Sequence, residues 1–330
     1  MNILITGGAG YIGSITNNLL QQSGHHTVVF DNLQNGCRSA IGKTDFIWGD
    51  LKNKSDIENA FQMYRYDAVI HFAALALARE SMEQPYRYYE NNILGGINLL
   101  EFMNRYHCRN IVFSSTCAVY GYPNKLPVTE NESYKPVSVY GSSKRMFEEI
   151  IEWYTKIHKI NAAILRYFNA AGALPDGSLG EDHRPESHII PILIKTALSG
   201  GQFNLFGADY QTPDGTCVRD YIHVLDLARA HLEALGYLME KNMSVTVNLG
   251  IGHGYSNLEV LRTTEKVTGK KIPYKVVARR RGDPDSIYAD NTKAKQILNW
   301  KPEFKTLESI IKTAYIWHKN HPKGFDNDKT

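Results

Sequence analysis

Short apolar runs alternate with amphipathic stretches through the first half of the chain. Runs at residues 3–6, 27–30, 45–48, 68–74, 110–116 and 162–169 are apolar on consecutive positions, which is typical of strands buried on both faces. Residues 14–23, 85–106 and the stretch after Tyr140 space their apolar positions as helices do. This alternation predicts an α/β fold with a Rossmann-type, doubly wound parallel sheet. Ligands of such sheets bind beyond the carboxyl ends of the strands.

The second half of the chain has a different texture. Residues 171–220 are rich in Gly, Pro, Asp and His, with a predicted helix near Ile189 to Leu198. Residues 224–231 are helical in pattern again, and residues 245–249 form an apolar run typical of a strand. We therefore expect a Rossmann domain at residues 1–170, with a return segment near 222–250, and a smaller mixed lobe at residues 171–330.

A glycine-rich turn follows the first apolar run. It reads Gly-Gly-Ala-Gly-Tyr-Ile-Gly over residues 7–13 and leads into a helix. Gly7 and Gly10 let the backbone turn tightly and approach a pyrophosphate, Gly13 lets the helix pack close to the sheet, and the helix N-terminus faces the anion. The second run ends in Asp31, whose carboxylate suits the ribose hydroxyls of an adenosine and repels a 2′-phosphate. The series predicts NAD rather than NADP; the alternative is a glycine turn without a ligand.

Tyr140 and Lys144 lie four positions apart, on one face of a predicted helix. A phenol has a pKa of about 10, and a cation one helical turn away can lower it. The helix dipole also favours an anion in the first turn. Tyr-x-x-x-Lys by itself is as often a surface pattern as a functional one. Together with a dinucleotide fingerprint, it predicts a tyrosine that acts as a general base.

Composition narrows the class of protein further. The 330 residues carry a net charge of +3, which is too mild to indicate nucleic acid binding. The four cysteines, Cys37, Cys108, Cys117 and Cys217, show no C-x-x-C spacing and fit a reducing compartment. The histidines show no metal-ligand spacing, so no metal is expected. No apolar run has the length of a membrane span, and the chain enters a core strand by residue 3, so we expect a cytoplasmic enzyme without a signal peptide.

Several longer motifs carry a family resemblance. They include TGGAGYIG (6–13), VIHFAA (69–74), VYGSSK (139–144), LRYFNAAGA (165–173), PESHIIP (185–191), DGTCVRDYIHVLDLA (214–228) and RRRGDP (279–284). Through them the chain resembles the extended short-chain dehydrogenase/reductase superfamily. Within it, the chain is most similar to the UDP-glucose (UDP-galactose) 4-epimerase family, from residue 1 to about residue 317. The resemblance implies bound NAD, a UDP-sugar substrate, inversion at C4 through a transient 4-keto sugar, a homodimer, and a smaller lobe that binds the UDP-sugar.

The resemblance also implies three sets of site residues. The catalytic set is Tyr140, Lys144 and Thr116. The cofactor-binding set is Gly7, Gly10, Tyr11, Ile12, Gly13, Asp31, Asn32, Asn35, Asp50, Leu51, Phe72, Ala73, Ala74, Asn91, Ser114, Tyr140, Lys144, Tyr167 and Phe168. The substrate-binding set is Thr116, Asn169, His188, Phe206, Arg219, Tyr221, Arg280, Asp283 and Ile287.

The sugar and the reaction leave alternatives open. Ala76 stands where many epimerases have Lys, and Ile287 occupies the position thought to face the sugar 2-substituent. UDP-arabinose/UDP-xylose and UDP-N-acetylhexosamine 4-epimerases therefore remain alternatives. Nucleotide-sugar 4,6-dehydratases and UDP-glucuronate decarboxylases share the fold, but dehydratases carry Asp-Glu near the position of Cys117-Ala118. A catalytically silent NAD-sensing regulator is the alternative of another class, and such proteins tend to lose the Tyr or the Lys.

Overall fold

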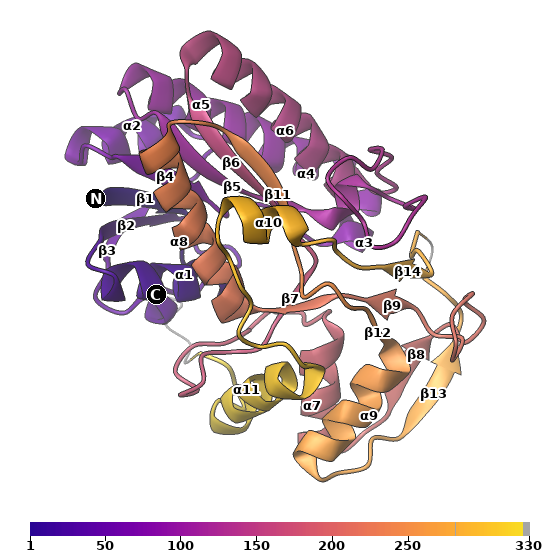
Figure 1. The fold of residues 1–330 in the computed structure, drawn as a ribbon. Coiled ribbons are helices and arrows are strands. Elements are labelled where there is room, and N and C mark those ends of the chain that lie inside the picture. Colours follow the sequence, from indigo (N-terminus) through magenta and orange to yellow (C-terminus); the bar gives the residue numbers. More distant parts are fainter. Residues whose placement is uncertain (281, 326–330) are drawn as a thin grey trace.

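A parallel sheet of seven strands forms the larger part of the molecule. The structure is a computed structural model that describes residues 1–280 and 282–325. The strand order is β11-β6-β5-β4-β1-β2-β3 (Figure 1). The strands are β1 Asn2–Thr6, β2 His26–Asp31, β3 Asp45–Trp48, β4 Ala68–His71, β5 Asn110–Thr116, β6 Asn161–Tyr167 and β11 Val245–Leu249. Each neighbouring pair is parallel. The predicted α/β fold class is confirmed.

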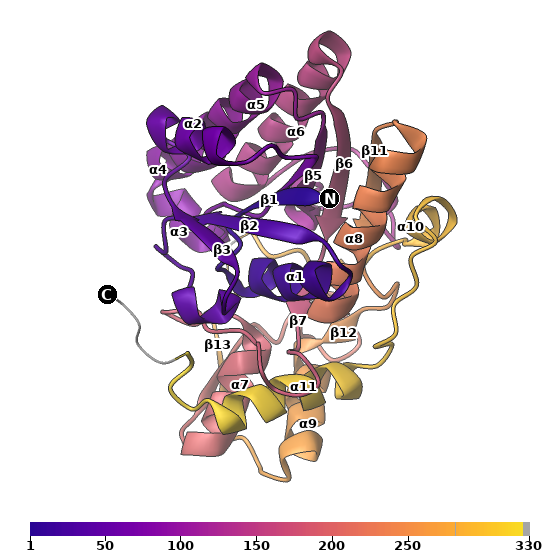
Figure 2. The ribbon, with the colours of Figure 1, turned by 90° about the vertical axis from the view of Figure 1, so that its left-hand side faces the viewer.

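Helices cover both faces of this sheet. Figure 2 shows α2 (Lys54–Met63), α5 (Gly95–Arg105) and α6 (Val139–His158) on one side, and α1 (Tyr11–Gln22) and α8 (Val224–Lys241) on the other. Successive residues of a strand point to opposite faces. Ile3 and Ile5 therefore pack in the core that contains Leu227 of α8, whereas Leu4 packs in the core that contains Phe147 of α6. Burial on both sides explains why the strands are apolar at consecutive positions.

Three predicted elements end or break earlier than expected. The predicted strand 68–74 stops at His71, because the N–H groups of Phe72 and Ala73 both donate to the Thr6 carbonyl and turn the chain away. The predicted strand 162–169 divides into β6 and β7 (Asn169–Ala171). The predicted helix 85–106 divides into α4 (Pro85–Tyr89), a π-helical turn η2 (Glu90–Leu94) and α5.

A smaller, mixed part of the molecule lies beyond the carboxyl ends of the strands. It contains a β10-β7 pair, a β12-β9-β14 sheet and a β13-β8 pair. Its strands are β8 Phe203–Phe206, β9 Val218–Arg219, β10 Tyr221–His223, β12 Tyr255–Ser256, β13 Tyr274–Val277 and β14 Ser286–Ile287. Helices α7 (Ile189–Ser199), α9 (Asn257–Thr268) and α11 (Leu307–Asn320) share one core around Leu193, Leu261 and Ile310.

The remaining elements are short. They are the helices α3 Ala78–Glu83 and α10 Thr292–Ile297 and the 3-10 turns η1 Arg38–Ile41 and η3 Cys117–Val119. After α10, Trp300 packs in the core of the large sheet and its Nε1 donates to the Asp226 carbonyl at 2.8 Å. The chain therefore passes between the two parts of the molecule more than once. Within the described residues, no helix is both long and apolar enough to cross a membrane.

Candidate active site

A cavity of about 1910 Å³ runs along the carboxyl ends of the strands, between the large sheet and the smaller part of the molecule. Its wall contains nearly all the residues that the sequence motifs and the family resemblance identified as site residues. The predicted residues on its wall are Gly7, Gly10, Tyr11, Ile12, Gly13, Asp31, Asn32, Asn35, Asp50, Leu51, Phe72, Ala73, Ala74, Asn91, Thr116, Tyr140, Lys144, Tyr167, Phe168, Asn169, His188, Phe206, Arg219, Arg280, Asp283 and Ile287.

Ser114 and Tyr221 are the two predicted residues that do not line the cavity. Ser114 is buried in β5, where its hydroxyl is hydrogen bonded to His231 Nε2 at 2.8 Å. Its carbonyl accepts a hydrogen bond from Lys144, so Ser114 lies behind the wall and holds a wall residue. Tyr221 of β10 packs into the core of the smaller part of the molecule, because its strand turns that side chain toward α7 and α11.

The glycine turn after β1 has the geometry expected of a pyrophosphate site. Gly7 has a positive φ of 71°, and a Cβ there would lie 2.4 Å from the Ala73 nitrogen, so no other residue fits. A Cβ on Gly13 would lie 2.4 Å from the Gly7 carbonyl oxygen. Helix α1 begins at Tyr11, and its N-cap, Gly10, has no side chain to cap the first turn. The N–H groups of that turn are therefore suited to an anion on the cavity side.

Asp31 lies at the end of β2 with its carboxylate held by the backbone. One oxygen accepts from Ala9 N at 3.0 Å and the other from Leu33 N at 2.8 Å. Burial raises the pKa of this carboxyl, while the two backbone hydrogen bonds act in the opposite direction. A carboxylate oxygen accepts more than one hydrogen bond, so both oxygens can still receive ribose hydroxyls. The donor and acceptor set at this end of the cavity fits an NAD molecule.

Tyr140 lies in the first turn of α6, at the centre of the cavity wall. Ser138 caps this helix by accepting a hydrogen bond from Gly141 N at 3.1 Å. Burial raises the pKa of the Tyr140 phenol to about 12, and a hydrogen bond with the Thr116 side chain partly offsets this rise. Two residues of the predicted catalytic set, Tyr140 and Thr116, therefore interact in the structure.

Burial has the largest effect on the pKa of Tyr140 in the protein alone, and Lys144, on the same wall, is held by neighbouring residues. Its Nζ donates to the Ser114 carbonyl at 2.9 Å and lies 4.8 Å from the centre of the Phe113 ring. Burial lowers the pKa of Lys144 to about 7, against a smaller raising effect of the Glu148 carboxylate. Desolvation penalises the charged forms of both residues, so burial has the largest effect on the pKa of each.

Two guanidinium groups lie at the other end of the cavity. Arg219 Nη1 donates to the carbonyls of Val218 and Pro284, both at 2.8 Å. Its buried Nη2 has no hydrogen-bond partner within the described residues, and lies 3.4 Å from the Asp283 carboxylate. Arg280 stacks over the Phe206 ring at 4.1 Å. Guanidinium groups with free donors suit a diphosphate.

Ile287 and Phe168 form an apolar part of the cavity wall. Ile287 of β14 is buried against Val119 and Phe168. Asn169 lies beside them and its Nδ2 donates to the Asp220 carbonyl at 3.0 Å. This is the wall that a sugar would meet between the phenol of Tyr140 and the arginines.

The segment 181–188 contributes more to the cavity than the sequence predicted. Only His188 was expected there, yet Glu181, Asp182 and His183 also line the wall. His188 Nδ1 lies 2.6 Å from the Glu181 carboxylate, and His183 Nδ1 lies 2.9 Å from the same oxygen. The signal in the sequence is the close spacing of three acids and two histidines over eight residues.

The fold and this site define an NAD-dependent enzyme of the short-chain dehydrogenase/reductase type, with a tyrosine and a lysine on one helix beside a dinucleotide turn. Residues 3–250 match the model of the NAD dependent epimerase/dehydratase family. The chain belongs to this family, and the relatives below point to one of its activities.

The chain is 48% identical to a UDP-glucose 4-epimerase of Lactobacillus helveticus over 329 residues, covering 99% of this chain and 100% of the relative. It is 47% identical to a UDP-glucose 4-epimerase of Streptococcus mutans, covering 99% of both. Among solved structures, the UDP-glucose 4-epimerase of Bifidobacterium longum in complex with NAD+ and UDP has a TM-score of 0.94 and 37% identity, covering 98% of this chain and 100% of that one. These matches confirm the family, the fold class and the NAD cofactor that the sequence predicted.

Proposed function

We propose that this protein is a UDP-glucose 4-epimerase that converts UDP-galactose to UDP-glucose by inverting C4, with NAD as a bound cofactor. The main observation behind this proposal is that the dinucleotide turn, the Tyr140–Thr116 pair and the two arginines all line one cavity. A UDP-sugar with its diphosphate at Arg219 and Arg280 brings its sugar toward Tyr140. The high identity to curated UDP-glucose 4-epimerases over the full chain supports the same activity.

The residues divide the chemistry as follows. Bound NAD supplies a reversible hydride acceptor for C4 of the sugar. Tyr140 takes the proton of the C4 hydroxyl, and Thr116 holds a hydrogen bond at the same oxygen. The resulting 4-keto sugar turns over while the diphosphate stays at the arginines, and C4 is reduced on its other face. Because burial is the main cause that raises the pKa of Tyr140 to about 12, the positive charges of Lys144 and the nicotinamide are needed beside the phenol in the loaded enzyme.

The structure offers no acid or base for the dehydratase alternative at the expected place. Cys117 and Ala118 follow Thr116 on the cavity wall. Burial raises the pKa of the Cys117 thiol to about 12, so it stays neutral and unreactive near neutral pH. Both Tyr140 and Lys144 line the cavity, which argues for catalysis over a silent NAD-sensing role.

The preferred sugar is a hexose with a 2-hydroxyl. Ile287 lines the cavity next to Phe168, and its side chain lacks the bulk of an aromatic ring. Two relatives mark the alternatives: a bifunctional UDP-glucose and UDP-xylose 4-epimerase of Pisum sativum, at 40% identity, and a UDP-Glc/GlcNAc 4-epimerase of Campylobacter jejuni, at 38% identity.

Product analysis tests this proposal. The purified protein is incubated separately with UDP-galactose, UDP-arabinose and UDP-N-acetylgalactosamine, and the products are identified by NMR. We expect UDP-glucose to form fastest. Faster conversion of either other substrate would change the assigned sugar, and loss of water from any of them would replace the epimerase by a dehydratase.

In this proposal, different parts of the chain bind the cofactor and the substrate. Residues 1–170, with the return segment 222–250, bind NAD, and residues 171–330 bind the UDP-sugar. The four cysteines are unpaired, which fits the reducing conditions of the cytoplasm.

We also propose a homodimer formed through an apolar α4–α6 patch, defined here as Tyr86, Leu94, Met146, Trp153 and Ile157. These side chains are exposed, and Tyr86 and Ile157 are 75% and 63% exposed. Helix α4 and the turn η2 both pack against α6, so the residues belong to neighbouring elements. Exposed apolar side chains gathered on neighbouring helices are typical of a protein–protein interface.

A further inference from the structure

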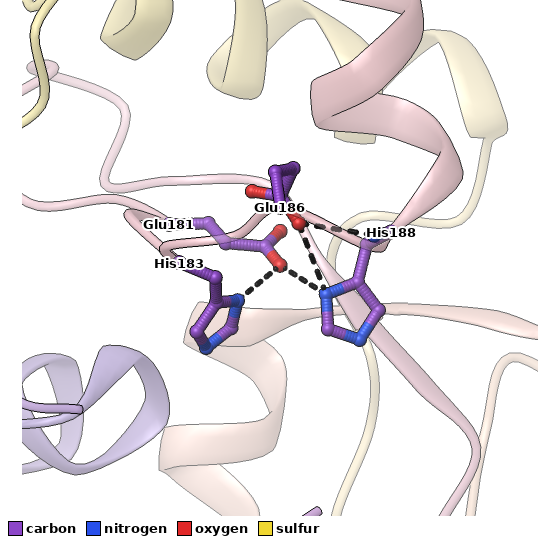
Figure 3. A group of neighbouring side chains, drawn as sticks. All are labelled: Glu181, His183, Glu186 and His188. Atoms are coloured by element: carbon purple, nitrogen blue, oxygen red, sulfur yellow. Dashed lines mark hydrogen bonds and ion pairs between the residues drawn. The ribbon is translucent and has the colours of Figure 1, made fainter. Parts of the chain in front are cut away.

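The segment between β7 and α7 brings two carboxylates and two imidazoles together. Glu181, His183, Glu186 and His188 each offer one ligand atom, and these four atoms lie within 4.8 Å of one another. Figure 3 shows both Nδ1 atoms turned toward the Glu181 carboxylate, with that of His188 also facing Glu186. Among the described residues this is a cluster that the reaction proposed above does not use as a unit.

The spacing of the four atoms suits a small divalent ion. Glu181 Oε1 lies 2.9 Å from His183 Nδ1 and 2.6 Å from His188 Nδ1, and Glu186 Oε1 lies 3.4 Å from His188 Nδ1. In a tetrahedral zinc site with bonds near 2.0–2.1 Å, neighbouring ligand atoms are about 3.3 Å apart. Two of the three distances are shorter than this value and one is close to it, and all four atoms lie within 4.8 Å of one another, so side-chain torsions would adjust to hold an ion.

Both carboxylates are buried and held in place before any ion arrives. The Glu186 side chain is 9% exposed, and its Oε1 accepts from the backbone nitrogens of Ser187 and His188 at 2.8 and 3.0 Å. Its Oε2 has no hydrogen-bond partner within the described part of the chain; Lys195 Nζ lies 3.8 Å away. Glu181 is 4% exposed, and Trp317 Nε1 fixes its backbone carbonyl at 3.0 Å. The oxygen of Glu186 that faces the imidazoles is Oε1, which lies 3.4 Å from His188 Nδ1 (Figure 3).

The imidazoles leave the cluster open to ions from the cavity. The side chains of His183 and His188 are 32% and 49% exposed, and both line the cavity. Two nitrogen and two oxygen ligands favour zinc, cobalt or nickel over magnesium and calcium, which prefer all-oxygen sites. Ion pairs between protonated histidines and the glutamates are the competing explanation of the same distances.

We propose that Glu181, His183, Glu186 and His188 form a binding site for one divalent transition-metal ion of the zinc type at the edge of the cavity. The ion would sit near the dinucleotide turn, because the His183 ring packs edge-on against that of Tyr11 with centroids 6.2 Å apart. This inference is independent of the proposed epimerase function, since it rests on the four ligands alone. The sequence pattern, Glu-x-His-x-x-Glu-x-His, matches none of the familiar zinc spacings, so the sequence alone does not predict this site.

Cobalt binding to the whole protein tests the site. Purified full-length protein with its cofactor is stripped with a chelator, dialysed, and titrated with Co²⁺ while its visible spectrum is recorded. We expect the intense d–d bands of tetrahedral cobalt with one ion per chain, and their loss when Zn²⁺ displaces the cobalt. Absence of the tetrahedral bands, or only the weak bands of hydrated cobalt, would overturn the proposal in favour of ion pairs.

Variants separate this cluster from other histidines. His183→Ala and Glu186→Gln are compared with His253→Ala, which removes an exposed histidine away from the cavity wall. Calorimetric Zn²⁺ titration should show affinity at least about tenfold weaker in the first two variants and unchanged affinity in the third. Circular dichroism checks that each variant is folded. Equal Zn²⁺ affinity in all three would place the metal elsewhere and contradict the assignment, whatever the epimerase assay shows.

Discussion

Tyr140 combines two properties that oppose each other: it is deeply placed on the cavity wall, and its proposed role needs it to lose a proton. Tyr140→Phe removes the hydroxyl and keeps the ring, so the fold and bound NAD should be retained. Turnover of UDP-galactose should fall by roughly a hundredfold or more, the usual value of a general base. Steady-state kinetics on protein of verified NAD content measure this effect. Near-normal turnover would remove Tyr140 from the reaction.

Lys144 should change how the free energy of unfolding of the NAD-free protein depends on pH. Its pKa is about 7 in the folded protein, against about 10.5 in the unfolded chain. Above pH 7 the unfolded state therefore binds more protons at this residue, and Lys144 makes the free energy of unfolding rise with pH. His188, whose pKa is raised to about 10 mainly by Glu181 against the effect of burial, acts in the opposite direction.

The comparison is therefore between wild type and Lys144→Met, in which only the lysine is lost. Urea denaturation at pH 7 and at pH 8.5 gives the free energy of unfolding of each. The difference, wild type minus variant, should increase between the two pH values. A constant difference would mean that Lys144 keeps its ordinary pKa in the folded protein.

Ile287 should limit the size of the sugar 2-substituent. Ile287→Ser removes volume from the cavity and should raise kcat/KM for UDP-N-acetylgalactosamine relative to UDP-galactose. Filling or emptying such a pocket changes discrimination by about ten- to two-hundredfold. Both substrates are measured on the same preparation. An unchanged ratio would show that Ile287 does not face the sugar.

Most of the predicted site residues line the cavity. The glycine turn and the Tyr140–Lys144 spacing are local patterns that imply their own geometry, and the family resemblance supplied most of the others. The sequence could not place Ser114 or Tyr221, because the face to which a strand residue points depends on what packs against the strand. The sequence could not predict the raised pKa of Tyr140 either, because the burial of its phenol depends on residues that are distant in the chain.

At the scale of elements, a buried ion pair fastens α6 to β6 behind the cavity. Arg166 donates two hydrogen bonds to the Glu148 carboxylate, at 2.9 and 2.7 Å, and the side chains are 3% and 0% exposed. Glu148→Ala leaves Arg166 buried without its partner and should lower the free energy of unfolding by about 3–5 kcal/mol.

Glu149→Ala is the matched control, because its side chain on the same helix is 54% exposed and pairs with Arg145. Exposed pairs contribute about 0–1 kcal/mol. Urea denaturation compares the two variants with wild type. Similar losses in both variants would show that the Glu148–Arg166 pair does not stabilise the fold.

The strands were the most predictable elements. Because they are buried on both faces, their residues are apolar at consecutive positions. The π turn η2 was not predictable from periodicity. It carries Asn92, whose side chain accepts from Leu75 N at 2.9 Å and donates to Leu75 O at 3.0 Å, a contact between segments far apart in sequence. The early end of β4 depends in the same way on the Thr6 carbonyl of a neighbouring strand.

At the scale of the whole molecule, the apolar α4–α6 patch should set the assembly state. Light scattering coupled to size exclusion should give twice the mass of the 37.3 kDa chain. Trp153→Arg places a charge in the patch and should shift the protein to the monomer. Met63→Arg, at a residue on α2 that is 63% exposed against 60% for Trp153, should leave the mass unchanged. A dimer that survives Trp153→Arg would require another interface.

The position of β11 has a consequence for how the protein is made. β11 (Val245–Leu249) pairs with β6 (Asn161–Tyr167), although nearly eighty residues separate them in the chain. Domains fold from the N-terminus as the ribosome extends the chain. The outer backbone groups of β6 therefore stay unpaired until translation has passed Leu249, and an unpaired strand edge is prone to aggregation. Nascent chains halted before that residue should need chaperones, whereas those halted beyond it should not.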